Sequence, residues 1–116
     1  MDDDLVASGR YARLETRGRR TGRPRNVTVG FVEEAGGMLL VASRPGGQWA
    51  DNLLDDPGCR VTVGDRTWTA RAEPLEGVEF AATIRELILR YGTPAEKLGG
   101  GPAFRLRPES AIGDDR

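Results

Sequence analysis

The segment between Thr16 and Asn26 has the composition of an anion-binding loop. Gly18 and Gly22 allow backbone N–H groups to approach a ligand closely, and Thr21 adds a hydroxyl donor between them. Seven arginines lie between positions 10 and 25 against a single glutamate, in a chain whose formal net charge is only −1. This local excess of positive charge indicates a phosphate or carboxylate ligand. A solvent-exposed, arginine-rich hairpin would have the same residues, and the sequence leaves that alternative open.

An arginine-rich turn can also insert into the minor groove of DNA. The core of such a hook is Arg-Gly-Arg-Pro, whereas here Thr21 stands before Gly22-Arg23-Pro24, so the first arginine is missing. Hooks of this kind also lie in disordered chain, and this segment joins two predicted strands. We therefore expect no nucleic-acid partner.

A second candidate segment runs from Ser43 to Leu53. Two adjacent glycines precede a predicted short helix, where free N–H groups and the helix dipole favour an anion. Trp49, Asn52 and Leu53 are spaced to share one face of that helix. From these residues alone, the favoured interpretation is structural, with Trp49 and Leu53 packed inward and Asn52 capping a turn.

The residue types that are missing limit the chemistry. The chain has no histidine and one cysteine, which excludes histidine-based catalytic pairs, His-ligated metals and thiolate zinc sites, so we expect no metal. Cys59 has no disulfide partner in the chain and is expected to fill the core. Tyr91 ends a predicted long helix as a core residue or, alternatively, as a proton donor. An enzyme built on this chain would depend on a cofactor or on carboxylate, hydroxyl and arginine groups.

The hydropathy pattern predicts one domain with mainly antiparallel β structure. We expect strands at 10–17, 27–32, 38–43, 60–63, 67–73 and 103–106, and helices at 48–55 and 78–91. Hairpin turns at 33–37 and at Gly64-Asp65 connect strands directly, and this argues against repeated βαβ units. An antiparallel sheet curled into a small barrel fits better. The barrel domain would span 10–108, between a flexible acidic N-terminus at 1–9 and a flexible polar tail at 109–116.

The ends and the apolar runs of the chain bear on its location. The longest apolar run is far too short for a transmembrane helix. The chain begins Met1-Asp2-Asp3-Asp4, which is acidic where a signal peptide would be basic. A cytoplasmic protein without an integral membrane segment is expected.

Four motifs occur in one order along the chain: Gly18-Arg19-Arg20-Thr21-Gly22-Arg23-Pro24-Arg25, Val41-Ala42-Ser43-Arg44-Pro45-Gly46-Gly47, Trp49-Ala50-Asp51-Asn52-Leu53, and Asp56-Pro57 ahead of Val61-Thr62-Val63. In this order they resemble the deazaflavin-dependent nitroreductase family, within the flavin and deazaflavin split β-barrel oxidoreductases. The resemblance covers the chain from Leu14 to Leu106. It departs from the family pattern in a shorter loop before Trp49 and in a tyrosine-rich segment reduced to Tyr91.

The resemblance implies a fold and an activity. The fold would be a mainly β (α+β), six-stranded antiparallel split β-barrel with two helices, similar to FMN-binding split barrels. Open barrels of this size tend to cover an edge by pairing, so a homodimer is expected. The implied reaction is hydride transfer from the reduced 8-hydroxy-5-deazaflavin coenzyme (F420) to a quinone or nitroaromatic acceptor, with the cofactor supplying the chemistry. FMN or FAD is the alternative cofactor, and a non-redox small-molecule or lipid binder is the alternative function.

The family's site residues carry over to matching positions here. Those that would contact the cofactor phosphate are Arg20, Thr21, Gly22 and Arg25. Those that would lie along the deazaflavin are Asn26 and Val27 at its edge, Ser43 near the reacting ring, Arg44 in place of a family lysine, and Trp49 and Asn52 on the helix. The candidate catalytic residues are Ser43 and Tyr91.

Overall fold

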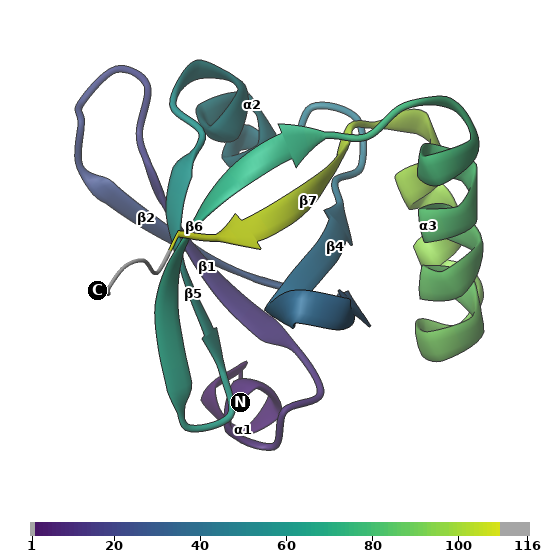
Figure 1. Cartoon of the computed structure of the whole chain (residues 1–116). Helices are drawn as coiled ribbons and strands as arrows, with labels where there is room; N and C mark the ends of the chain where they lie inside the picture. Colours follow the sequence, from purple (N-terminus) through teal and green to yellow (C-terminus); the bar gives the residue numbers. More distant parts are fainter. Residues whose placement is uncertain (1, 110–116) are drawn as a thin grey trace.

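Strands are the main regular elements of this computed structural model, in which they form a curled sheet flanked by helices (Figure 1). The structure describes residues 2–109, without the side chains of residues 2, 3, 93, 94, 96 and 97. Its strands are β1 (Ala12–Arg17), β2 (Pro24–Val29), β3 (Val32–Glu34), β4 (Met38–Ala42), β5 (Gly58–Val63), β6 (Arg66–Pro74) and β7 (Ala103–Pro108). Its α-helices are α1 (Asp2–Ala7), α2 (Gln48–Asp55) and α3 (Gly77–Tyr91), and its 3-10 helices are η1 (Ala35–Gly37) and η2 (Thr93–Gly100).

The strands form one antiparallel sheet in the order β2-β1-β5-β6-β7-β4-β3. Its two edge strands, β2 and β3, are consecutive in the chain and are joined only by Gly30 and Phe31. The two edges of the sheet must therefore meet at this connection. The sheet consequently curls into a barrel that is closed at one end and split at the other.

The prediction of six strands was wrong by one, because the strand expected at 27–32 bends at Gly30. The ring of Tyr91 lies against this glycine, and a Cβ there would come within 2.7 Å of Tyr91 Cε2. The Tyr91 hydroxyl accepts a hydrogen bond from the Phe31 N–H at 3.0 Å and donates one to the Arg10 carbonyl at 2.7 Å. These contacts fix the chain in a bend where β propensity alone predicts continuation.

The N-terminal residues form a helix that was not predicted from the sequence. Residues 2–109 therefore contain three α-helices, whereas two were predicted. Val6 of α1 is buried, and its carbonyl accepts a hydrogen bond from the Gly64 N–H at 2.8 Å. Helix α1 therefore packs under the β5–β6 hairpin (Figure 1). At the other end, residues 110–116 of the expected tail lie outside the described residues.

Two apolar clusters stabilise the fold. One fills the barrel and includes Leu14, Val61 and Phe104, and the other packs α3 and η2 against β4, with Leu87 at its centre. Cys59 is buried in the first cluster, as predicted, and helix α2 has the predicted bounds. No helix within residues 2–109 is both long and apolar enough to cross a membrane.

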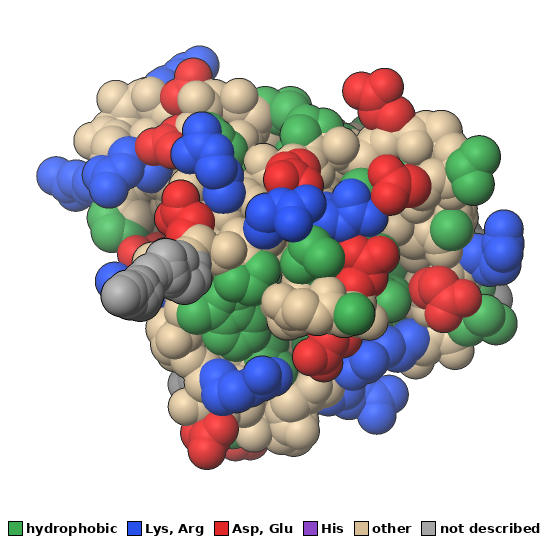
Figure 2. Space-filling model, in the orientation of Figure 1, with side chains coloured by type: hydrophobic (Ala, Val, Ile, Leu, Met, Phe, Trp, Pro, Cys, Tyr) green, Lys and Arg blue, Asp and Glu red, His purple; other side chains and the backbone are tan. Residues whose placement is uncertain are grey.

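Ion pairs between β7 and its neighbours add to this packing. Arg105 binds Glu34 of β3 at 2.8 Å and Glu79 of α3 at 2.7 Å, and both carboxylates raise the pKa of its guanidinium. Arg107 of β7 pairs with Glu73 of β6 at 2.8 Å. Figure 2 shows acidic and basic side chains interspersed over this face. Several basic side chains lie at the upper left, where Figure 1 places the β1–β2 connection and α2, with acidic ones among them.

The hydroxyl of Tyr91 should be worth measurable stability. Tyr91→Phe removes the hydroxyl's hydrogen bonds to Arg10 and Phe31 and leaves the partly buried Phe31 N–H without its partner. We expect a loss of about 1–2 kcal/mol in the free energy of unfolding, measured by urea denaturation. Tyr11→Phe is the matched control, because the Tyr11 ring packs against Tyr91 while its hydroxyl has no partner among the described residues. Equal effects of the two substitutions would contradict the bend mechanism.

Candidate functional site

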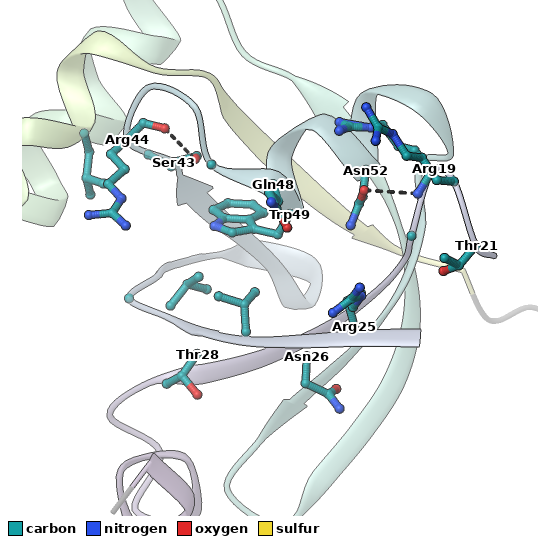
Figure 3. Close-up of a pocket in the computed structure, with 18 residues that line it drawn as sticks. Arg19, Thr21, Arg25, Asn26, Thr28, Ser43, Arg44, Gln48, Trp49 and Asn52 are labelled. Carbon is teal, nitrogen blue, oxygen red and sulfur yellow. Dashed lines mark hydrogen bonds between the residues drawn. The ribbon is translucent and has the colours of Figure 1, made fainter. Parts of the chain in front are cut away.

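A cavity of about 830 Å³ lies in the split of the barrel, within the size range of small-molecule and cofactor sites. Strand β3 pairs with β4 only as far as Leu40, so the remaining edge of β4 has no strand beside it among the described residues. The gap that opens between β4 and β2 is the cavity, and helix α2 and the β1–β2 loop complete its wall (Figure 3). Its lining residues are Gly18–Thr21, Arg25–Gly30, Ala42–Arg44, Gly47–Trp49, Asn52 and Leu98.

The charge of the lining is positive. Four arginines contribute to it, and none of the described lining residues is acidic. Arg19 pairs with Asp51 at 3.3 Å, whereas Arg20, Arg25 and Arg44 form no ion pair with any described residue. Unpaired guanidinium groups around a concave site favour an anionic ligand and can bind phosphate in a bidentate manner. The cavity therefore has the electrostatics of an anion site.

The β1–β2 loop, Gly18–Arg23, has a shape set by its own backbone. The Gly18 N–H donates to the Arg23 carbonyl and the Gly22 N–H donates to the Gly18 carbonyl, both at 2.9 Å. The Thr21 hydroxyl accepts from the Arg23 N–H at 3.2 Å, so part of its hydrogen-bonding capacity is used in the turn. Gly22, at φ 71°, makes the tight turn possible and does not line the cavity. Internal bonding of this kind also argues against a free minor-groove hook.

Strand β2 presents alternate side chains to the cavity. In Figure 3 the side chain of Arg25 lies on the same side of the strand as Trp49, whereas those of Asn26 and Thr28 point to the opposite side. The period of two along a strand accounts for this difference. Val27 is half-buried and packs against the barrel core. Asn26 can therefore line the cavity only through its backbone.

Ser43 lies at the end of β4 with 2% of its surface exposed. Its hydroxyl donates to the Arg44 carbonyl at 2.7 Å, so the proton is held within its own loop and the oxygen lone pairs remain for a ligand. Gly47 lies against this hydroxyl, because a Cβ there would overlap Ser43 Oγ. Arg44 follows at the end of the cavity away from Arg19 and Arg25 (Figure 3).

Helix α2 supplies the opposite wall. The half-buried indole of Trp49 lies between Arg44 and Asn52 in Figure 3 and packs against Phe104, with 6.1 Å between ring centroids. The side chain of Asn52 is buried and bonded to the protein on both of its polar atoms. The shared helix face predicted for these two residues is present, and it is the cavity wall.

The structure does not bring every candidate together. Tyr91 lies outside the cavity, at the closed end of the barrel, with its hydroxyl bonded to Arg10 and Phe31. Conversely, several lining residues were not predicted, among them Thr28–Gly30, Ala42, Gln48 and Leu98. Gln48 begins the predicted helix and could have been found from its position one residue before Trp49. Leu98 lies in η2, and no periodic pattern marks that segment in the sequence.

Comparison with known proteins places these features in a family. The sequence profile of the F420H2-dependent quinone reductases matches residues 6–94, most of the chain. The chain belongs to this family. Among curated relatives, the F420H2-dependent quinone reductase of Mycobacterium tuberculosis is 28% identical over 67 residues, which cover 54% of this chain and 45% of that protein. The chain thus spans less than half the length of the curated relative it matches.

Solved structures support the split-barrel fold of this family member. An F420H2-dependent reductase, FDR-A, superposes with a TM-score of 0.73 at 24% identity, covering 84% of this chain and 94% of that one. HutZ, a heme storage protein from Vibrio cholerae, has a TM-score of 0.75 at 21% identity, with 94% and 88% of the chains covered. At these identities the likeness shows the fold. None of the described residues that line the cavity is a His, Cys, Met or Tyr, the residues that ligate haem iron, so these residues do not suit haem.

Cys59 should be unreactive in the folded family member. Burial, followed by the charge of Glu109, raises the pKa of its thiol to about 12. At pH 8 only about one thiol in ten thousand would then be ionised, and the thiolate is the reactive form. We expect a thiol-specific disulfide reagent to modify the native protein at least a hundredfold more slowly than the urea-denatured protein. Similar modification rates in the native and denatured protein would mean that the Cys59 thiol is accessible and that its pKa is not raised.

Proposed function

We propose that this chain binds the reduced deazaflavin coenzyme F420 in the cavity and transfers a hydride from it to a quinone. The observation that carries the proposal is the pairing of an acid-free lining with three arginines that have no ion-pair partner among the described residues. F420 carries a phosphodiester and a glutamate tail, so its site must offset several negative charges. Membership of the F420H2-dependent quinone reductase family supports the same assignment.

Different residues of the cavity would bind different parts of the cofactor. Arg20 and Arg25, in the loop and at the start of β2, would hold the phosphate through charge-assisted hydrogen bonds. The indole of Trp49 and the apolar side chains of β2 provide flat, water-excluding walls for a ring system. When bound, the reduced coenzyme supplies the hydride.

Ser43 and Arg44 would act at the other end of the cavity. The Ser43 oxygen can accept a hydrogen bond from the cofactor while its proton stays on the Arg44 carbonyl. Arg44, exposed and without an ion pair to a described residue, would add positive charge beside an electron-poor acceptor. Because Tyr91 is bonded elsewhere, we do not assign it a catalytic role.

The acceptor, the cofactor alternative, the oligomeric state and the location are further predictions. Nitroaromatic compounds are the second class of acceptor, and FMN or FAD is the alternative cofactor. We expect the protein to be a homodimer in the cytoplasm. In the non-redox lipid-binder alternative on the same barrel, a fatty acid would bring a single carboxylate to a lining with three arginines that have no ion-pair partner among the described residues. This charge pattern favours F420, which carries several negative charges, over a ligand with one or none.

Equilibrium titration with F420, FMN and FAD, followed by fluorescence, tests the proposal directly. F420 should bind most tightly, and the protein with reduced F420 should consume a soluble quinone such as menadione under anaerobic conditions. Binding of a fatty acid without binding of any of the three cofactors would establish the lipid-carrier alternative instead.

The contribution of Arg25 can be measured against a neighbour in the same loop. Arg25→Ala should weaken F420 binding by about ten- to a hundredfold, because a desolvated hydrogen bond to a charged group is worth roughly 1.5–3 kcal/mol. Arg23→Ala is the matched control, since Arg23 is exposed in the same segment and does not line the cavity. It should change affinity by less than about threefold. Equal losses for both variants would mean that only the general positive field matters.

A further inference from the structure

Helix α2 and its C-cap contact the β1–β2 loop and the end of β1 at three points. Asp51 pairs with the Arg19 guanidinium at 3.3 Å, and Asp56, the C-cap of the helix, pairs with the Arg17 guanidinium at 3.7 Å. The third contact is the hydrogen bond between Asn52 Oδ1 and the Arg19 backbone N–H at 3.3 Å. The loop that carries the anion-binding residues is therefore attached to a helix more than thirty residues later in the sequence.

Of these three contacts, the one made by Asn52 is the best shielded from water. The Arg17, Arg19, Asp51 and Asp56 side chains keep between 37% and 66% of their surface exposed, and exposed ion pairs contribute little. Asn52 is only 5% exposed, and its Nδ2 group donates to Thr16 Oγ1 at 3.1 Å, where Thr16 is 2% exposed. The amide orientation follows from the partners, because the Arg19 N–H can only donate and must face the Asn52 oxygen.

The two residues bonded to Asn52 are the direct neighbours of the two arginines assigned to the phosphate. Arg19 precedes Arg20 in the loop, and Thr16 is the cross-strand partner of Arg25 in the β1–β2 register. One buried amide thus fixes the backbone next to Arg20 and the strand position opposite Arg25. Figure 3 shows Asn52 between Trp49 and Arg19, with its dashed bond to the loop.

We propose that Asn52 is a positioning residue that holds the β1–β2 loop so that Arg20 and Arg25 converge on the phosphate of the cofactor tail. Both polar groups of Asn52 are bonded to the protein, so its effect on the ligand is exerted through the loop. The expected consequence is selectivity for a tail-bearing deazaflavin over a tail-free one. This inference rests on the proposed function.

Asn52→Leu is the principal test, since leucine keeps the shape of the side chain and removes both hydrogen bonds. Two probes are titrated into each protein: F420, and the deazaflavin chromophore with its ribityl chain but without phosphate and glutamates. The wild type should prefer F420. In Asn52→Leu this preference should fall at least about tenfold through weaker F420 binding, while affinity for the tail-free probe stays within about twofold. An equal loss for both probes, or no loss for either, would overturn the inference.

Thr16→Val provides a second variant if Asn52→Leu does not fold. It removes the Asn52–Thr16 bond and should shift the preference in the same direction by a smaller factor. Thr83→Val is its matched control, because Thr83 is equally buried and its hydroxyl donates at 2.8 Å to Glu79 within α3, away from the cavity. It should lower the melting temperature without changing the preference. A shift in Thr83→Val as large as in Thr16→Val would reduce the role of Asn52 to general stability.

Hydrogen exchange of the Arg19 amide separates this inference from the proposed function. In the protein without ligand, this amide should be protected, and Asn52→Leu should accelerate its exchange at least about tenfold while the amides of β5 are unchanged. Unchanged exchange at Arg19 would refute the positioning role whatever the ligand. If the wild type bound neither deazaflavin, the proposed function would fail, and an accelerated Arg19 amide would still show that Asn52 holds the loop.

Discussion

The packing of Tyr91 against the bend at Gly30 determines where the cavity forms. Because Tyr91 fills the space beside Gly30 and holds Phe31 by its N–H, β2 cannot continue and the chain crosses from one edge of the sheet to the other. That crossing closes one end of the barrel. The other end is left split, and the cavity occupies the split. A residue that does not itself line the cavity therefore shapes it through its contact with Gly30, which does line it. The tyrosine that could be a proton donor by its sequence position has a structural role.

Local patterns predicted the elements of the fold well. The alternation in β1 and β6, the Gly64-Asp65 hairpin and the apolar face of α3 all depend on residues close together in the chain, and the structure contains each of them. The seventh strand and helix α1 were missed for a physical reason. The break at Gly30 is imposed by Tyr91, 61 residues later, and α1 is stabilised where the buried Val6 packs near the β5–β6 hairpin. Secondary-structure propensities of neighbouring residues carry no information about either contact.

The sequence motifs predicted which residues line the cavity better than they predicted what each residue does there. Most of the residues named from the motifs line one cavity, which no periodicity argument could have established. Three assignments changed once orientation was known: Gly22 shapes the turn, Asn26 points away, and Asn52 bonds to the protein. The alternation along β2 could have separated Arg25 from Asn26 in advance. The partners of Asn52 could not have been found, because they lie 33 and 36 residues away.

The arginine cluster shows why a run of like charge cannot be interpreted from its length alone. Arg17 and Arg19 are paired with acids of the α2 region, and Arg13 is engaged as well. What remains for a ligand is a smaller set, Arg20 and Arg25, together with Arg44 from a different segment. The paired arginines add exposed contacts to the hydrogen bonds that hold the loop, and the unpaired ones provide positive charge at the cavity. A loop with such internal bonds has less conformational freedom to lose when an anion binds. Pre-ordering lowers the entropic cost of binding. Asp51 in α2 and Asp56 at its C-cap divide the cluster in this way. The same helix carries Trp49 and Asn52, so the helix that forms one wall of the cavity also bonds to the loop at its edge.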